Sequence, residues 1–150
     1  MQVSAQRAVP VLLCLLVLAT PSFAAAWKPL GPFGGTVFSL TVAPSDPHRL
    51  YAVAKEGVFR STDGGGSWTA IRPDAGSNVA VDPTRPDTLY LGIQTGGEPG
   101  GVQKSTDGGA HWTGLPLKSF AVLSVAVDPA RPSRLYAGTV TQGVWRSTNG

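Results

Sequence analysis

The sequence predicts an all-β fold built from short antiparallel strands. Of its 150 residues, 19 are glycine and 13 are proline, which leaves little room for long helices. Between these turn-forming residues lie short runs rich in Val, Thr, Tyr, Trp and Phe, the residue types that strands prefer. Apolar residues make up 42% of the chain and charged residues 14%, so the chain has enough apolar surface to bury a core.

A repeat organises most of the chain. The pattern Ser-Thr-Asp-Gly-Gly-x-x-Trp occupies residues 61–68 and 105–112, and Ser-Thr-Asn-Gly begins a third copy at 147–150. Gly-Val-x-basic precedes each copy, at 57–60, 101–104 and 143–146. Val-x-Pro-x-x-Pro, followed three residues later by Leu-Tyr, recurs at 42–51, 81–90 and 127–136. A period of about 43 residues fits the four-stranded blade of a β-propeller.

Each repeat predicts four short strands, named A to D in chain order. Strand A is expected at Thr36–Val42, Asn78–Val81 and Val122–Val127, where side chains alternate as they do in a strand with two different faces. Strand B carries Leu-Tyr and strand C carries Gly-Val-x-basic-Ser. Strand D is expected to start at Trp68 and Trp112.

The Ser-Thr-Asp-Gly-Gly segment is then the hairpin turn between strands C and D. Ser and Asp side chains bond to the backbone of a turn, glycine adopts positive φ without steric cost, and the Trp can pack on the neighbouring blade. We interpret these positions as structural rather than catalytic: Ser61, Asp63, Gly64, Gly65, Trp68, Ser105, Asp107, Gly108, Gly109, Trp112, Ser147, Asn149 and Gly150.

A fourth match to strand D lies before the first strand A. Trp27-Lys28-Pro29-Leu30 is similar to Trp68-Thr69-Ala70-Ile71 and has the spacing to strand A that Trp112 has. We therefore expect an orphan N-terminal strand, two full blades and one partial blade. Propellers use about 4–8 blades, so we expect an incomplete β-propeller of four-stranded antiparallel blades, truncated at residue 150, that aggregates or partly unfolds. The alternative is a natural short protein that assembles from several copies.

Residues 1–26 have the character of a signal peptide. A basic residue precedes the apolar run 9–19, and small-x-small sites predict cleavage after Ala24 or Ala26, with secretion or a periplasmic location. The apolar run is short for a membrane anchor, which is the alternative. Cys14, the only cysteine, lies in this segment, so disulfides and thiolate sites are not expected in the mature chain.

These motifs resemble the BNR/Asp-box repeat β-propeller superfamily over Trp27–Gly150. Sialidases, xyloglucan-active endoglucanases, sortilin-type receptors and a photosystem II assembly factor belong to it. The resemblance implies that the Asp box is a structural turn remote from catalytic residues, so Asp63 and Asp107 are expected to be scaffold. It also offers a photosystem-factor role as a third possibility, although a shared fold by itself does not define a function.

The expected topology indicates where a functional site lies. If the A–B and C–D turns share one face, the D–A and B–C loops share the opposite face, here called the loop face. It would carry the candidate binding residues Phe33, Lys55, Arg72, Gln94, Lys118 and Gln142 and the weak catalytic candidates Glu56, Asp74 and Glu98. The longest B–C loop, residues 95–101, is either part of a binding site or a tolerated insertion.

Two functions follow from this arrangement. The first is an exported binding or scaffold module that holds a glycan or a protein ligand on the loop face. The alternative is a glycoside hydrolase of sialidase or xyloglucanase type, which needs two carboxylates. The Arg-Ile-Pro segment of sialidases is absent, and Val53–Glu56 lacks the Asp that the xyloglucan-active family places after its Tyr. The catalytic acids would then lie mostly in further blades.

Several classes are disfavoured. The net charge of +3 is spread along the chain without the basic stripe that nucleic-acid binding favours. No metal site is expected, because His48 and His111 lack the spacing of metal ligands. The glycine-rich stretches do not join a strand to a helix as a phosphate-binding loop does, so no cofactor is expected. No membrane partner is expected after signal cleavage.

Overall fold

The structure is a computed structural model that describes residues 27–33, 35–74, 76–94, 100–117 and 121–150. Over these ranges the chain forms strands and turns, and it contains no helix long and apolar enough to cross a membrane. The expected signal peptide, Glu98, Lys118 and most of the loop 95–101 lie outside the described residues.

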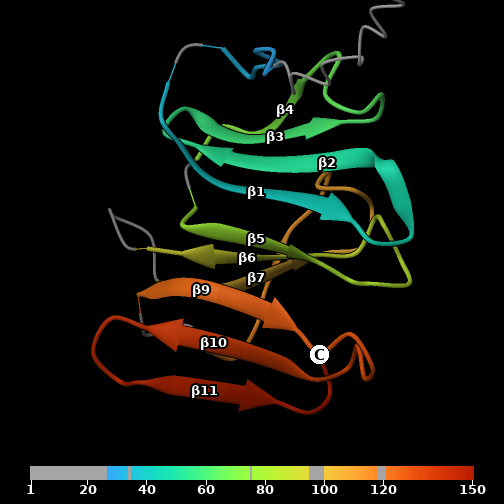
Figure 1. Cartoon of the computed structure of the whole chain (residues 1–150). Coiled ribbons are helices and arrows are strands. Elements are labelled where there is room, and N and C mark those ends of the chain that lie inside the picture. The colour runs from blue at the N-terminus through green and yellow to red at the C-terminus, as the bar shows by residue number, and fades with distance from the viewer. Residues whose placement is uncertain (1–26, 34, 75, 95–99, 118–120) are drawn as a thin grey trace, which may run out of the picture.

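The strands form three antiparallel sheets that lie one after another (Figure 1). Blade 1 contains β1 (Val37–Ala43), β2 (Asp46–Ala54), β3 (Gly57–Ser61) and β4 (Thr69–Arg72). Blade 2 contains β5 (Asn78–Val81), β6 (Leu89–Ile93), β7 (Gly101–Ser105) and β8 (Thr113–Gly114). Blade 3 contains β9 (Val122–Val127), β10 (Leu135–Thr139) and β11 (Val144–Ser147). The two full blades and the partial blade are thus confirmed.

The expected strand positions are confirmed closely. Strand A is β1, β5 and β9; the last two have the expected bounds and β1 is shifted by one residue. The D strands β4 and β8 begin one residue after Trp68 and Trp112. In every blade the Tyr of strand B pairs with the basic residue of strand C, as in Tyr51 with Arg60, so the register repeats from blade to blade.

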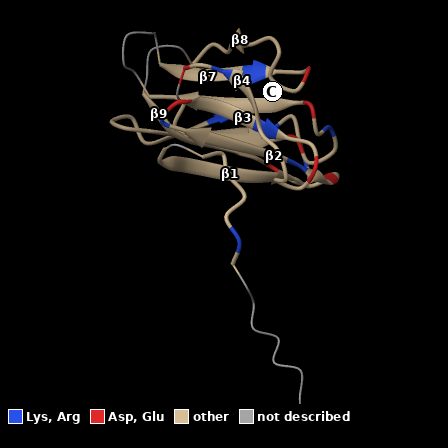
Figure 2. Cartoon of the chain, turned by 90° about the horizontal axis from the view of Figure 1, so that it is seen from above, with Lys and Arg blue, Asp and Glu red and all other residues tan. Residues whose placement is uncertain are grey.

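The prediction of an orphan N-terminal strand is wrong, because residues 27–33 form no β-structure. A D strand forms only when it pairs with the C strand of its own blade. Among the described residues, no C strand lies beside this segment. Leu30 nevertheless takes the place of a D-strand residue. Leu30 packs against Gly65 of blade 1 as Ile71 packs against Gly109 of blade 2, and Trp68 Nε1 donates to the Leu30 carbonyl at 2.8 Å. Figure 2 shows this segment leaving blade 1 away from the sheets.

Two apolar clusters hold neighbouring blades together. The cluster between blades 1 and 2 includes Val53, Val79 and Leu91, and Ile71 and Trp112 pack against it. The cluster between blades 2 and 3 is built around Tyr90, Val102, Val122, Val125 and Leu135. Each fully buried aliphatic side chain contributes about 1.5–3 kcal/mol relative to exposure, so packing between sheets stabilises this arrangement. The expected packing of Trp112 on the neighbouring blade is confirmed.

Candidate functional site

The turns gather on one face of the blades, as the sequence predicts. In blade 1 the C–D turn bonds to the A–B turn region, where the Gly64 amide donates to the His48 carbonyl at 2.9 Å. The Gly108 amide of blade 2 donates to the Asp87 carbonyl at the same distance. We call this side the Asp-turn face, and we call residues 61–68 and 105–112 the Asp turns.

The remaining connections gather on the loop face. The Lys55 amide in the B–C turn donates to the Thr36 carbonyl at 3.0 Å, which joins that turn to the segment before β1. The Ser77 amide in the D–A loop donates to the Gly92 carbonyl at the end of β6 at 2.8 Å. The predicted division into two faces is therefore confirmed by the backbone.

Each Asp turn is fixed by its own serine and aspartate. Ser61 Oγ donates to Asp63 Oδ1 at 2.7 Å and accepts from the Gly65 amide at 2.9 Å. The Ser67 amide and hydroxyl donate to the two oxygens of Asp63, at 2.9 and 2.6 Å. The second turn repeats this geometry through Ser105 and Asp107, and in the third copy Ser147 Oγ donates to Asn149 Oδ1 at 3.0 Å.

These hydrogen bonds keep the turn carboxylates ionised. Donation from the Ser67 hydroxyl and amide, and from Ser61, lowers the pKa of Asp63 to about 2. The backbone amide and the ring of His111 hold the pKa of Asp107 well below its usual range. A general acid needs a pKa near the working pH, so this geometry favours the structural interpretation of both aspartates.

The basic residue of the C strand in blades 1 and 2 reaches the turn after the C strand of the next blade, a contact that no sequence motif predicted. Arg60 Nη1 donates to the Gly108 carbonyl at 3.2 Å, and Lys104 Nζ donates to the Gly150 carbonyl at 3.0 Å. Lys104 also lies 5.4 Å from the ring centre of Tyr90. The available signal was the basic residue that precedes every Ser-Thr pair.

Two predicted binding residues contact other parts of the chain. The Arg72 side chain is only 13% exposed, because it donates to Gln103 Oε1 of blade 2 and lies 6.0 Å from the Trp112 ring centre. Its planar guanidinium links blade 1 to blade 2 through these contacts. Phe33 lines a hollow of about 310 Å³ with Phe59, beside Ser67 and Trp68 on the side of blade 1.

The other described candidates keep exposed side chains on the loops. Lys55 and Glu56 occupy the B–C turn of blade 1, and Asp74, Gln94 and Gln142 lie in loops of successive blades. The two described carboxylates lie on different loops: Asp74 is 3.5 Å from Arg72 Nη2, and the Glu56 carboxylate lies over Gly35. Within the described ranges, no group of three His, Cys, Asp or Glu side chains is placed to hold a metal ion.

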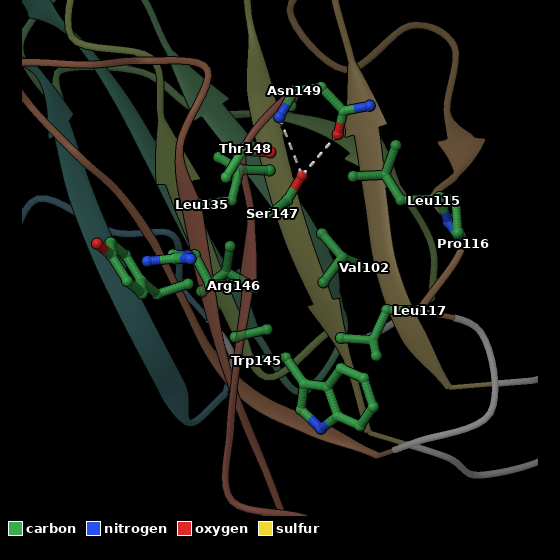
Figure 3. A pocket seen from close by; sticks show the side chains of 14 residues that line it. Val102, Leu115, Pro116, Leu117, Leu135, Trp145, Arg146, Ser147, Thr148 and Asn149 are labelled. Carbon is green, nitrogen blue, oxygen red and sulfur yellow. Dashed lines mark hydrogen bonds between the residues drawn. The ribbon is translucent and has the colours of Figure 1, made fainter.

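A cavity of about 550 Å³ lies elsewhere, between blades 2 and 3. Figure 3 shows Val102, Leu115 and Leu117 along it, with the Ser147–Asn149 turn at one end and the Trp145 indole at the other. Its lining is mainly apolar, and β11 forms one wall. No motif within one repeat predicts this cavity, because its walls come from different repeats.

Solved structures similar to this chain are propeller proteins. An ancestral GH74 enzyme matches 75% of the chain at 23% identity with a TM-score of 0.64. The GH74 xyloglucanase from Xanthomonas campestris matches 77% at 27% identity with a TM-score of 0.62. YCF48 from Cyanidioschyzon merolae matches 84% at 24% identity with a TM-score of 0.63. No family model and no curated protein matches the chain.

The fold is therefore that of an incomplete β-propeller with four-stranded antiparallel blades. The chain spans 17%, 20% and 38% of the lengths of these three proteins. The likeness at 23% and 24% identity concerns the fold alone.

Proposed function

We propose that this chain is part of an exported propeller module that binds a ligand on its loop face, a glycan in preference to a protein. The observation that carries the proposal is the convergence of loops from successive blades on one face, with exposed side chains at their tips. Lys55, Asp74, Gln94 and Gln142 supply donors and acceptors of the kinds that sugar hydroxyls pair with. Similarity to a xyloglucanase at 27% identity supports a glycan as the ligand class.

Calorimetric titration of the purified chain with xyloglucan oligosaccharides tests this proposal. We expect saturable binding, and we expect Gln94→Ala and Asp74→Ala each to weaken it about tenfold, the effect of losing about 1.4 kcal/mol. Thr106→Ala, an exposed position on the Asp-turn face, is the matched control and should bind as the unaltered chain does. Absence of binding, or equal loss in the control, would refute the loop face as the site.

A glycoside hydrolase is the second candidate, favoured by the two GH74 enzymes among the similar structures. That reaction needs two carboxylates flanking one glycosidic bond. Glu56 and Asp74 are the described carboxylates of the loop face, and the Asp74 carboxylate pairs with Arg72. The catalytic acids of a hydrolase would therefore come mostly from further blades. If the chain releases reducing ends from xyloglucan, and Glu56→Gln or Asp74→Asn abolishes that release, the hydrolase replaces the binding module.

Export is a separate part of the proposal, supported by the sequence of residues 1–26. We expect the exported protein to begin at Ala25 or Trp27, because the small-x-small sites end at Ala24 and Ala26. N-terminal sequencing of protein recovered from the periplasm or the medium decides the point. Protein that retains Met1 and stays with the membrane would support the anchor instead.

A further inference from the structure

Strand A of each blade lies at a sheet edge and contacts strand A of the next blade (Figure 1). In an antiparallel ladder, every second residue turns its amide and carbonyl away from the neighbouring strand. In β5 the Asp82 amide donates to the Thr88 carbonyl of its own blade. Val79, three residues earlier, therefore turns its amide and carbonyl to the open edge of β5. This edge is open because of the strand order within a complete blade.

Strand A of blade 1 supplies partners for both of these backbone groups. Thr41 Oγ1 donates to the Val79 carbonyl at 2.8 Å, and Ser39 Oγ accepts from the Val79 amide at 3.4 Å. An unsatisfied sheet edge is a template for pairing with another chain. Here two hydroxyls from the preceding blade occupy the edge. Because both bond to one residue, they also fix the position of β5 along β1.

Strand A of blade 2 bonds to blade 3 in the same way. Asn78 Oδ1 accepts from the Val125 amide at 2.5 Å. These two residues are the repeat equivalents of Ser39 and Val79. The alternation along β9 matches that along β5, so the Val125 amide also has no partner in its own sheet. Two different side chains, a hydroxyl and a carboxamide, therefore do the same work at one position of the repeat.

Ser77, in the loop before β5, adds a second contact to β9. Its hydroxyl lies 2.6 Å from the Val122 carbonyl at the start of β9 and 3.1 Å from the Gly92 carbonyl near the end of β6. The hydroxyl has one proton, and we assign it to the nearer Val122 carbonyl, because the Ser77 amide already donates to Gly92 at 2.8 Å. The repeat equivalents Phe38 and Leu123 have no polar side chain for such a contact.

We propose that Ser77 and Asn78 are positioning residues that together clamp β5 to β9 and hold the loop-face segments at Gly92 and Val122 beside each other. Asn78 fixes the middle of β9 and Ser77 fixes its start. Two points of attachment along one strand fix both its register and its angle, which a single contact does not. Gln94 follows Gly92 by two residues, so the clamp also fixes the base of its loop. The consequence for ligand binding rests on the proposed function, whereas the clamp itself does not.

Hydrogen exchange of the isotopically labelled chain, followed for each amide by NMR, tests the clamp, because exchange reports local opening. Asn78→Ala should speed exchange of the Val125 amide about fivefold, the scale of one hydrogen bond. The Asp128 amide, which bonds within blade 3, should keep its rate. Asn78→Ser should restore protection of Val125, because Ser39 accepts from the equivalent amide in blade 2.

Ser39→Ala is the matched control for this measurement. It should speed exchange of the Val79 amide and leave the Val125 amide at its original rate. If Asn78→Ala leaves Val125 unchanged, or if Ser39→Ala speeds Val125 as much as Asn78→Ala does, the clamp is overturned. Equal acceleration of Val125 and Asp128 in Asn78→Ala would overturn it too, because blade 3 would then have loosened as a whole.

Titration with xyloglucan oligosaccharides tests the effect of the clamp on the loop face. Ser77→Ala should raise the Kd about fivefold without changing the number of binding sites, at a temperature where the variant is folded. Partial unfolding would instead reduce the number of sites. Ser124→Ala, the equivalent of Asn78 in blade 3 and exposed, should bind as the unaltered chain does. If the unaltered chain binds no glycan, the proposed function fails and the exchange rates still decide the clamp. If the chain binds and Ser77→Ala binds equally well, Ser77 does not position the loop face.

Discussion

Arg60 of blade 1 donates a hydrogen bond to the backbone carbonyl of Gly108, 48 residues further along and in the Asp turn of blade 2. Lys104 makes the same bond to Gly150 one repeat later. The turn thus has a role in packing as well as in its own hairpin. It closes the C–D connection of one blade and presents a carbonyl to the basic residue of the blade before it.

Removal of this link should destabilise the pair of blades. Arg60→Ala leaves the partly buried Gly108 carbonyl without its charged donor, and we expect a loss of ~1 kcal/mol in the free energy of unfolding. Arg131→Ala removes an exposed arginine from the Pro-rich turn before β10 and serves as the matched control. Urea unfolding of both variants provides the comparison. Equal stability of the two would mean that the link contributes nothing to packing.

The glycines of the Asp turn should be intolerant of side chains for two separable reasons. Gly109 has a φ of 95°, and a Cβ there would meet Ile71 of blade 1. Gly143, which lies in the B–C turn of blade 3 and not in an Asp turn, has a positive φ of 68° too, but nothing lies within 4 Å of its added Cβ. Gly143→Ala should therefore cost about 1–2 kcal/mol for the backbone alone, and Gly109→Ala should cost a further 1–3 kcal/mol, about the usual cost of overpacking. Thermal unfolding of the two variants measures the difference, and a smaller loss for Gly109→Ala would contradict the contact with Ile71.

Acid should unfold the protein partly through the Asp turns. The pKa of Asp63 is lowered from 3.8 to about 2, so its contribution to stability is complete above about pH 4 and disappears as the pH falls through 2. Asp107 acts in the same direction. Asp63→Asn should reduce the loss of stability between these pH values, whereas Thr106→Ala, an uncharged exposed position, should leave it unchanged. Denaturant midpoints measured between pH 4 and pH 2 report this loss of stability. If the midpoint falls with pH as steeply in Asp63→Asn as in the unaltered chain, Asp63 does not contribute to it.

A tyrosine hydroxyl that bonds to the next blade should contribute to the free energy of unfolding. Tyr51 is buried and its hydroxyl donates to the Pro86 carbonyl at 2.9 Å. Tyr51→Phe should lower the free energy of unfolding by ~1 kcal/mol, because it leaves that carbonyl without its donor. Tyr136 is the repeat equivalent in blade 3, and the structure gives its hydroxyl no hydrogen-bond partner among the described residues. Tyr136→Phe should consequently have a smaller effect on the same unfolding curve, and a larger one would contradict the assignment.

Local sequence patterns determined most of the strands correctly. Period-two alternation and repeated motifs located β5 and β9 with their observed bounds, and the tryptophans located the starts of β4 and β8 within one residue. The segment at Trp27 shows the limit of this reasoning. Its residues match a D strand, but a strand needs a neighbour to pair with, and a local pattern does not supply one.

Contacts between blades could not be predicted in the same way. Arg72 was expected at the loop face, yet Gln103 and Trp112 of the next blade bury it. The partner of a side chain depends on how two sheets pack, which no motif within one repeat specifies. Once one contact between blades is known, the repeat predicts the next. Because Arg60 contacts Gly108, Lys104 is expected to contact Gly150 from its equivalent position, as it does.

The central claim is that successive repeats pack with the same geometry, and two interproton contacts test it most directly. We expect nuclear Overhauser effects from the Ile71 methyl to the Gly109 α-protons, and from a Leu30 methyl to the Gly65 α-protons. Both contacts join segments that local structure alone would not bring together. If neither is observed while the strand contacts within each blade persist, the blades form but do not pack as described, and the account is wrong.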